Sequence, residues 1–305
     1  ILPWSILTSR TFIVSTVVGM LAMGGMIGVL SYLPTYLQMV YGYSATASGL
    51  LLVPITVGML VSSILSGVLV SRTDRYRIYP ILGPLMAAGA SFWLSRLTTS
   101  SPVWQISAAT FIMGAGVGLF FQLLVTVVQN ALPARHLGTA TSGNNFFREV
   151  GVSLGASLIG AAFSSGLTSN LTDRIGALAR SADPAVLGSL AQFKDADTSS
   201  LTPALVNKLP TALHDAVASS YADALLPIFG WMIPLFVATS VIALFLPEVP
   251  LSQKTAMEQI AEAEKEAESE VNEPTPREPD RAEEPTEQEP DMETAEPESA
   301  ADAER

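Results

Sequence analysis

Six long apolar stretches fill the first 246 residues of the chain, and a strongly acidic segment follows them. The stretches run over Phe12 to Leu37, Gly49 to Val70, Ile78 to Ser95, Val103 to Leu132, Gly143 to Gly166 and Leu225 to Leu246. Crossing the hydrocarbon core of a bilayer, about 30 Å thick, takes about 20 helical residues. Each stretch approaches or exceeds this length, so the sequence predicts an all-α membrane protein with six transmembrane helices.

The alternative is that these stretches are buried helices of a large soluble protein, which would carry a polar face at a period of 3.6 residues. The sixth stretch has no such face, and Leu, Ile, Phe and Val fill thirteen of its positions. Each of these residues favours membrane insertion by about 0.3 to 0.6 kcal/mol at the helix centre. The expected environment is therefore the lipid bilayer. Only the fifth stretch carries charge, at Arg148 and Glu149.

The distribution of Lys and Arg predicts the orientation in the membrane. Alternate connections lie on the same side, and one set holds seven basic residues: Arg10, Arg72, Arg75, Arg77, Arg135, Arg148 and Lys254. The short loops of the other set hold Arg96. Because short basic loops stay in the cytoplasm, we expect both ends of the chain to be cytoplasmic. The long connection over about 167–224 is then extracytoplasmic.

The net charge of −12 belongs to the end of the chain. From Leu251 onward there are 19 acidic and five basic residues, so residues 1–250 carry a charge of +2. The segment 251–305 is rich in Glu and Pro and has no aromatic residue, a composition that cannot bury enough apolar surface to fold. We predict a six-helix bundle over 1–250 and a disordered acidic cytoplasmic tail over 251–305. A docking segment for a basic partner is the alternative role of the tail.

The sequence gives no support for an enzyme or a metal protein. There is no cysteine, and the two histidines, His136 and His214, are far apart. Gly151-Val152-Ser153-Leu154-Gly155 matches a nucleophile elbow, but that motif requires a strand-to-helix turn. Here it lies within a helical run. We interpret these glycines as a surface for close helix packing, and the same holds for the pairs Gly24 and Gly28, and Gly114 and Gly118.

The connection between the second and third stretches carries a more specific pattern. Its members are Gly67, Ser71, Arg72, Asp74, Arg75 and Arg77. Glycine lets two helices approach, while arginine side chains can hold carboxylates or helix C-terminal carbonyls on a neighbouring bundle. We interpret the pattern as a cytoplasmic gating motif whose contacts form in one conformation and break in the other. A plain positively charged loop is the alternative.

Polar residues within the stretches are candidates for a substrate path and a gate. Gln122, Gln129 and Asn130 lie on the fourth stretch and form the possible path, because polar side chains at membrane depth usually face protein or a cavity. Simple interhelical hydrogen bonds are the alternative. Asn144, Asn145, Arg148 and Glu149 form the possible gate, which we expect near the cytoplasmic end of the fifth stretch.

The segment from Gly67 to Arg77 resembles the loop signature of the major facilitator superfamily, with Ser71 where the family usually has an acidic residue. The order of other features fits as well: Arg10-Thr11-Phe12, Tyr32 to Gln38, Ser48 to Pro54, Gly114 to Gly118, Val128 to Pro133, Ala140 to Ser142 and Phe146 to Gly151. From about Ile1 to Pro250 the chain resembles the C-terminal half of an EmrB/QacA-type drug:proton antiporter of the fourteen-helix class.

This resemblance implies proton-coupled efflux of small hydrophobic or cationic compounds across the plasma membrane. Two six-helix halves alternate in access around a central site, with the proton gradient as energy source and no cofactor. The chain begins in mid-pattern at Ile1, so we expect a C-terminal portion whose partners are the lipid bilayer and missing N-terminal helices that carry the proton-coupling acids. No nucleic acid partner is expected. The alternatives are export of an endogenous lipid, siderophore or metabolite, and a non-transporting membrane scaffold or sensor.

Overall fold

The computed structural model describes residues 7–73, 76–130, 137–180, 203–206 and 210–247. The chain divides into two units, Ile1–Ala263 and Glu264–Arg305, and every described residue belongs to the first. The predicted acidic tail over 251–305 lies outside the described residues.

All regular structure in the described part of the chain is helical. The helices are α2 (Arg10–Tyr41), α3 (Ala45–Leu50), α4 (Val53–Thr73), α5 (Ile78–Ser95), α6 (Val103–Asn130), α7 (Leu137–Arg180), α9 (Pro203–Val206) and α10 (Thr211–Ala243). They provide six segments that are long and apolar enough to cross a membrane, with α3 and α4 together forming the second. The predicted all-α membrane fold is confirmed.

Local sequence sets where the first helices begin and end. Ser9 Oγ accepts a hydrogen bond from the backbone N–H of Phe12 at 3.2 Å and so caps the start of α2. Gly42 ends α2 with a φ of 68°, a left-handed conformation that glycine adopts without strain. Pro54 lies in the first turn of α4, where its missing N–H costs no helical hydrogen bond.

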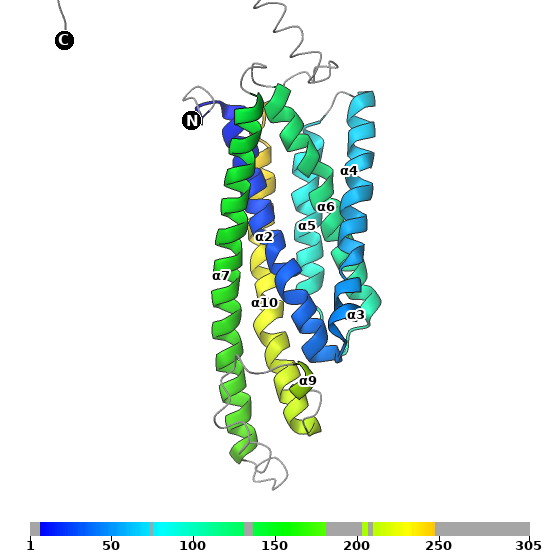
Figure 1. The fold of residues 1–305 in the computed structure, drawn as a ribbon, viewed down its shortest axis with the longest axis vertical. Coiled ribbons are helices and arrows are strands. Elements are labelled where there is room, and N and C mark those ends of the chain that lie inside the picture. Colours follow the sequence, from blue (N-terminus) through cyan, green and yellow to red (C-terminus); the bar gives the residue numbers. More distant parts are fainter. Residues whose placement is uncertain (1–6, 74–75, 131–136, 181–202, 207–209, 248–305) are drawn as a thin grey trace, which may run out of the picture. The chain divides into compact units, whose positions relative to one another are not determined.

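The spanning helices stand side by side along one axis (Figure 1). The helix α10 packs against α2, α5 and α7, while α6 packs against α4 and α5, and α2 packs against α7. The helices α7 and α4 lie at opposite sides of the view. Large side chains fill the space between the helices, and the largest that are fully buried are Tyr36, Phe120, Phe229 and Phe236.

Glycines bring three pairs of helices into backbone contact. A Cβ atom added at any of these positions would come within 3.0 Å of the facing helix backbone: Gly58, Gly114 and Gly118 for α4 and α6, Gly24, Gly151 and Gly155 for α2 and α7, and Gly83 and Gly116 for α5 and α6. The predicted packing role is confirmed for five of the six glycines named from the sequence. Gly28 differs, because a Cβ there would meet the side chains of Met232 and Ile159.

The last two spans are longer than the sequence predicted. The fifth was expected to end at Gly166 and the sixth to begin at Leu225, but α7 continues to Arg180 and α10 begins at Thr211. Both ends of the predicted outer connection over 167–224 are therefore helical. Apolar side chains explain the extension, because Leu167, Leu171, Val217 and Tyr221 are all buried in the main core.

Beyond this apolar contact, Arg174 of α7 forms an ion pair with Asp223 of α10. With 44 residues, α7 is about 66 Å long at 1.5 Å per residue, roughly twice the thickness of the hydrocarbon core. Part of α7 must therefore project beyond the bilayer, and the ion pair joins the two helices in that region.

Candidate substrate path and gate

The described residues of the predicted gating motif lie in two environments. Gly67, Ser71 and Arg72 are exposed on α4, whereas Arg77 contacts the end of α10. Gly67 and Arg72 lie on the exposed face of α4, where a Cβ added to Gly67 would have no neighbour within 4 Å. Arg72 forms no hydrogen bond or ion pair with any described residue. Ser71 is also exposed, and its Oγ donates to the carbonyl of Val68 at 2.8 Å. Both Gly67 and Arg72 are therefore available to a neighbouring bundle.

Arg77 acts within its own bundle instead. Its guanidinium donates to the carbonyl oxygen of Leu244 at the end of α10, and the hydroxyl of the preceding Tyr76 donates to the carbonyl of Pro247. Together these bonds fix the start of α5 to the end of α10. Asp74 and Arg75 lie outside the described residues.

The three residues of the predicted substrate path also separate. Gln122 is exposed on α6, whereas Gln129 is half-buried and its Nε2 donates to Thr141 Oγ1 of α7 at 3.3 Å. Gln129 thus makes the interhelical hydrogen bond that was its alternative role. Asn130 is the last residue of α6, and its side chain is not described. Of the two side chains that the structure describes, only that of Gln122 is exposed.

The predicted gate residues lie on the part of α7 that contacts α2 and α6. Asn144 is buried, and its Nδ2 donates to Thr16 Oγ1 of α2 at 3.1 Å. The guanidinium of Arg148 lies over the ring of Phe121 of α6, with 4.7 Å between Cζ and the ring centroid. Asn145 is half-buried between these two positions. These contacts place Asn144 and Arg148 at the junction of three helices.

Glu149 points away from that junction. Its side chain is 67% exposed, and its Oε1 lies 4.0 Å from Nη2 of Arg148. A charged carboxylate that faces lipid within the hydrocarbon core is costly. The surface of α7 that carries Glu149 is therefore suited to protein or water rather than to lipid.

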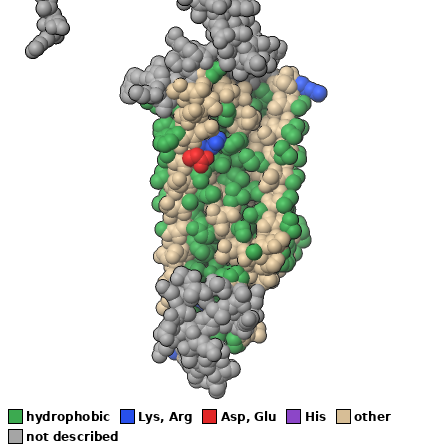
Figure 2. All heavy atoms as spheres, viewed as in Figure 1, with side chains coloured by type: hydrophobic (Ala, Val, Ile, Leu, Met, Phe, Trp, Pro, Cys, Tyr) green, Lys and Arg blue, Asp and Glu red, His purple; other side chains and the backbone are tan. Residues whose placement is uncertain are grey.

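A line of hydroxyl groups continues this surface along α7. Ser153, Ser157, Ser164 and Thr168 are exposed, and with Glu149 they fall within roughly 100° of arc at 3.6 residues per turn. We call Glu149 and these four residues the polar stripe. Sequence reasoning missed it, although the spacing of Glu149, Ser153 and Ser157 was a visible signal. Between the grey ends in Figure 2, the surface is green and tan except for one small red and blue patch, and further blue side chains show at the upper right and at the lower left edge.

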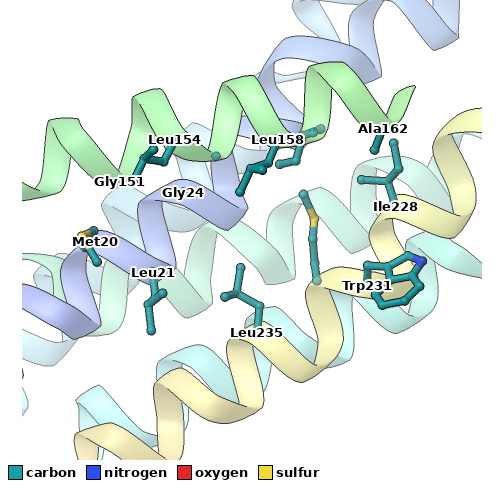
Figure 3. A pocket seen from close by; sticks show the side chains of 13 residues that line it. Met20, Leu21, Gly24, Gly151, Leu154, Leu158, Ala162, Ile228, Trp231 and Leu235 are labelled. Carbon is teal, nitrogen blue, oxygen red and sulfur yellow. The ribbon is translucent and has the colours of Figure 1, made fainter. Parts of the chain in front are cut away.

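A second surface of α7 is apolar. Leu154, Leu158 and Ala162 border a groove of about 580 Å³ whose other walls come from α2 and α10 (Figure 3). The remaining lining residues are Met20, Leu21, Gly24, Gly151, Gly155, Ile159, Ile228, Trp231, Met232 and Leu235. The groove presents almost no polar atoms, so only apolar groups such as lipid chains suit it. The polar stripe and this groove give α7 two different exposed surfaces.

The described residues contain no group of three or more His, Cys, Asp and Glu side chains that could hold a metal ion. Ser153, which the nucleophile-elbow pattern singled out, lies within the continuous helix α7 rather than at a strand-to-helix turn. The candidate site in the described residues is an arrangement of amides, hydroxyls and one charged pair.

The family model of the Major Facilitator Superfamily matches residues 1–156. The chain belongs to this superfamily. An uncharacterized MFS-type transporter of Mycobacterium tuberculosis (strain H37Rv) is 36% identical over 254 residues, which cover 83% of this chain and 34% of the relative. The multidrug transporter protein MdtP of Bacillus subtilis (strain 168) is 29% identical, over 85% of this chain and 50% of the relative. The superfamily resemblance inferred from the motifs is confirmed.

A tetracycline resistance determinant of Streptomyces rimosus is 26% identical over 79% of this chain and 72% of the relative. Among solved structures, a bacterial homolog of the human lysosomal transporter Spinster, in an inward-facing and occupied conformation, superposes with a TM-score of 0.57. Its identity is 18%, over 79% of this chain and 50% of that chain, so the likeness shows the fold alone. The chain spans between a third and a half of the length of the first two relatives.

Proposed function

We propose that this chain forms the C-terminal half of a fourteen-helix drug:proton antiporter that exports hydrophobic or cationic compounds across the plasma membrane. The observation that carries the proposal is a six-helix bundle of the major facilitator superfamily whose relatives include proteins named for multidrug transport and tetracycline resistance. Because the chain spans half or less of the first relatives, the complete transporter would contain a second bundle. Both ends of the present chain would be cytoplasmic.

The surface formed by Gln122 and the polar stripe would line the transport path. A substrate path needs polar groups to bind the solute, and Gln122 and the polar stripe supply exposed polar groups on α6 and α7. The apolar side chains around them suit hydrophobic substrates. The second bundle would cover this surface in one conformation and expose it in the other.

Gly67 and Arg72 would contact the second bundle at the cytoplasmic side. Replacing Arg72 or Arg75 by Ala should lower transport turnover more than substrate binding, because the interaction belongs to one conformation of the cycle. Efflux of a fluorescent drug from reconstituted vesicles measures turnover, and equilibrium binding of the same drug measures affinity. Unchanged efflux at normal protein amounts would reduce the motif to a signal for membrane orientation.

A pair of glycine variants tests the same contact with a matched control. Gly67 of α4 and Gly89 of α5 both lie in spanning helices, and a Cβ added at either would have no neighbour within 4 Å. Gly67→Leu should obstruct the approach of the second bundle and reduce efflux, whereas Gly89→Leu should leave efflux near the wild-type rate. Equal efflux by the two variants would argue against a bundle contact at Gly67.

Energy coupling is tested by the proton gradient. In everted vesicles containing the full-length protein, efflux should stop when a protonophore collapses the gradient. Residues 1–305 expressed alone should insert but not export, because alternating access needs a second half. Gradient-dependent efflux by this polypeptide alone would instead indicate a homodimer. Glu149 would then be the first candidate for the proton site, and Glu149→Gln should abolish coupling.

The same vesicles separate the other functions from drug export. An exporter of an endogenous lipid, siderophore or metabolite would move that compound and not the drugs. A scaffold or sensor would move neither, and deletion of its tail or outer connection would abolish its cellular role.

A further inference from the structure

Arg148 lies within the membrane-spanning part of α7. It precedes Gly155, where α7 crosses Gly24 near the middle of α2, by seven residues or about 10 Å of helix. Half the hydrocarbon core is about 15 Å thick. The Cα of Arg148 is therefore inside the hydrocarbon region, where a cation is costly unless it is paired.

The guanidinium of Arg148 is left without hydrogen bonds. It has five N–H donors, yet none of them reaches an acceptor among the described residues, and its Nε is completely buried. The nearest charge is Glu149 Oε1 at 4.0 Å from Nη2, which is beyond hydrogen-bond distance. The side chain is only 18% exposed, so water cannot satisfy all of these donors.

No neighbouring amide oxygen accepts a hydrogen bond from Arg148 in the described part of the chain. Asn144, one turn away on α7, donates to Thr16, and Gln129 of α6 donates to Thr141. The described arginines in comparable contact with other helices do have oxygen partners: Arg174 pairs with Asp223, and Arg77 donates to the carbonyl of Leu244. Arg148 therefore has donors that no described residue satisfies, with Glu149 Oε1 at 4.0 Å as the nearest carboxylate oxygen, and this suits the binding of an acceptor from outside the described residues.

We propose that Arg148 binds a carboxylate during the transport cycle. The planar guanidinium matches a carboxylate in a bidentate arrangement, and its Cζ lies 4.7 Å from the ring centroid of Phe121 at the junction of α6 and α7. The carboxylate comes either from the second bundle or from a transported compound. This inference rests on the proposed function, since it assumes that a second bundle or a substrate meets the face formed by α6 and α7.

Two variants of the full-length protein separate the charge from the packing. Arg148→Lys keeps a cation, whereas Arg148→Met keeps a long apolar stem that can lie on Phe121. A carboxylate from the second bundle would lose its partner in the Met variant, which should then melt at a lower temperature than the Lys variant. If no carboxylate meets Arg148, the Met variant should instead melt at a higher temperature than the Lys variant, because a thioether is better suited than an ammonium to an apolar junction.

The second source is tested with 1-naphthoate and its methyl ester. If a transported compound supplies the carboxylate, the Met variant should be at least as stable as the Lys variant without ligand. Naphthoate should then raise the melting temperature of the wild type and of Arg148→Lys but not that of Arg148→Met, and the ester should shift none of them. Arg174→Gln serves as the control, since this arginine lies on the same helix and already has a partner.

Efflux per folded protein gives the functional readout. Arg148→Met should export about tenfold less than the wild type, as expected for the loss of a charge-assisted hydrogen bond, and Arg148→Lys should retain an intermediate rate. A Met variant that melts no lower than the Lys variant, together with no naphthoate shift in the wild type, would overturn the inference. A wild type that exports nothing would refute the proposed function. The melting temperatures would still show whether Arg148 binds a carboxylate.

Discussion

Replacing Gly116 by Ala should force α5 and α6 apart. A Cβ added at Gly116 would lie 2.6 Å from the carbonyl oxygen of Gly83 and 2.9 Å from the backbone nitrogen of Ala87. Ordinary van der Waals contact begins at 3.4 Å, so the helices must separate locally by about 0.8 Å. Both facing atoms belong to the backbone, and no side-chain rotation can relieve the contact.

The cost follows from two opposing effects. Overpacking a well-packed interface typically costs about 1 to 3 kcal/mol, while replacing a helical glycine by alanine returns about 0.5 to 1 kcal/mol. Gly89→Ala is the matched control, because a Cβ added there would have no neighbour within 4 Å. The helix-propensity gain is common to both variants, so the difference between them isolates the packing cost of about 1 to 3 kcal/mol.

Thermal unfolding of the purified full-length protein in detergent measures this difference. At about 2 to 4 °C per kcal/mol for a unit of this size, Gly116→Ala should melt about 2 to 12 °C below Gly89→Ala. Both variants must be heated at the same rate, because membrane proteins often unfold irreversibly. Equal melting temperatures would show that α5 and α6 can move apart without loss, and the role assigned to Gly116 would be wrong.

Three further predictions concern the ends of the bundle. With no native cysteine in the chain, an impermeant thiol reagent should label Asp195→Cys and not Arg75→Cys from outside the cell, and the opposite result would invert the proposed topology. Removing residues from Asn272 onward should leave folding and efflux nearly intact, because a Glu- and Pro-rich segment has no apolar face with which to support the bundle; a large fall in membrane abundance would contradict this. Asp223→Ala should lower stability by less than about 1 kcal/mol, since the side chains of Arg174 and Asp223 are 43% and 53% exposed, and a double variant that also replaces Arg174 should melt close to the single one.

The sequence was informative wherever a property depends on spacing along one helix. The length of the apolar stretches predicted six spans, and pairs of glycines four residues apart predicted close helix packing at Gly114 and Gly118 and at Gly151 and Gly155. Both properties belong to a single helix. They could therefore be inferred without knowing its neighbours.

Properties that depend on how two helices face each other were not predictable in this way. Gln122 and Gln129 lie seven residues apart, yet Gln122 is exposed and Gln129 bonds to Thr141 of α7. The extension of α7 to Arg180 was missed for a related reason. Residues 167–180 are not apolar enough to indicate a span, and their helix depends on packing against the start of α10.

The glycine contacts define two closely packed groups of helices. Backbone contacts lock α4, α5 and α6 together, and a separate set locks α2 to α7. The helix α10 bridges the groups by packing against α2, α5 and α7. Between α6 and α7 the described links are side-chain contacts, at Gln129 with Thr141 and at Phe121 with Arg148.

We therefore expect some helix interfaces of the bundle to separate more easily than others. Sliding within either group would drive backbone into backbone, whereas side chains hold the seam between α6 and α7: one amide hydrogen bond, one ring contact and the buried apolar cluster that includes Val128 and Ala140. If the polar stripe lines the proposed transport path, this seam is where that path can change its width while the rest of the bundle keeps its shape. Under the proposed function, solutes of different bulk would then be accommodated by movement at the seam between α6 and α7 rather than by deformation of the whole bundle.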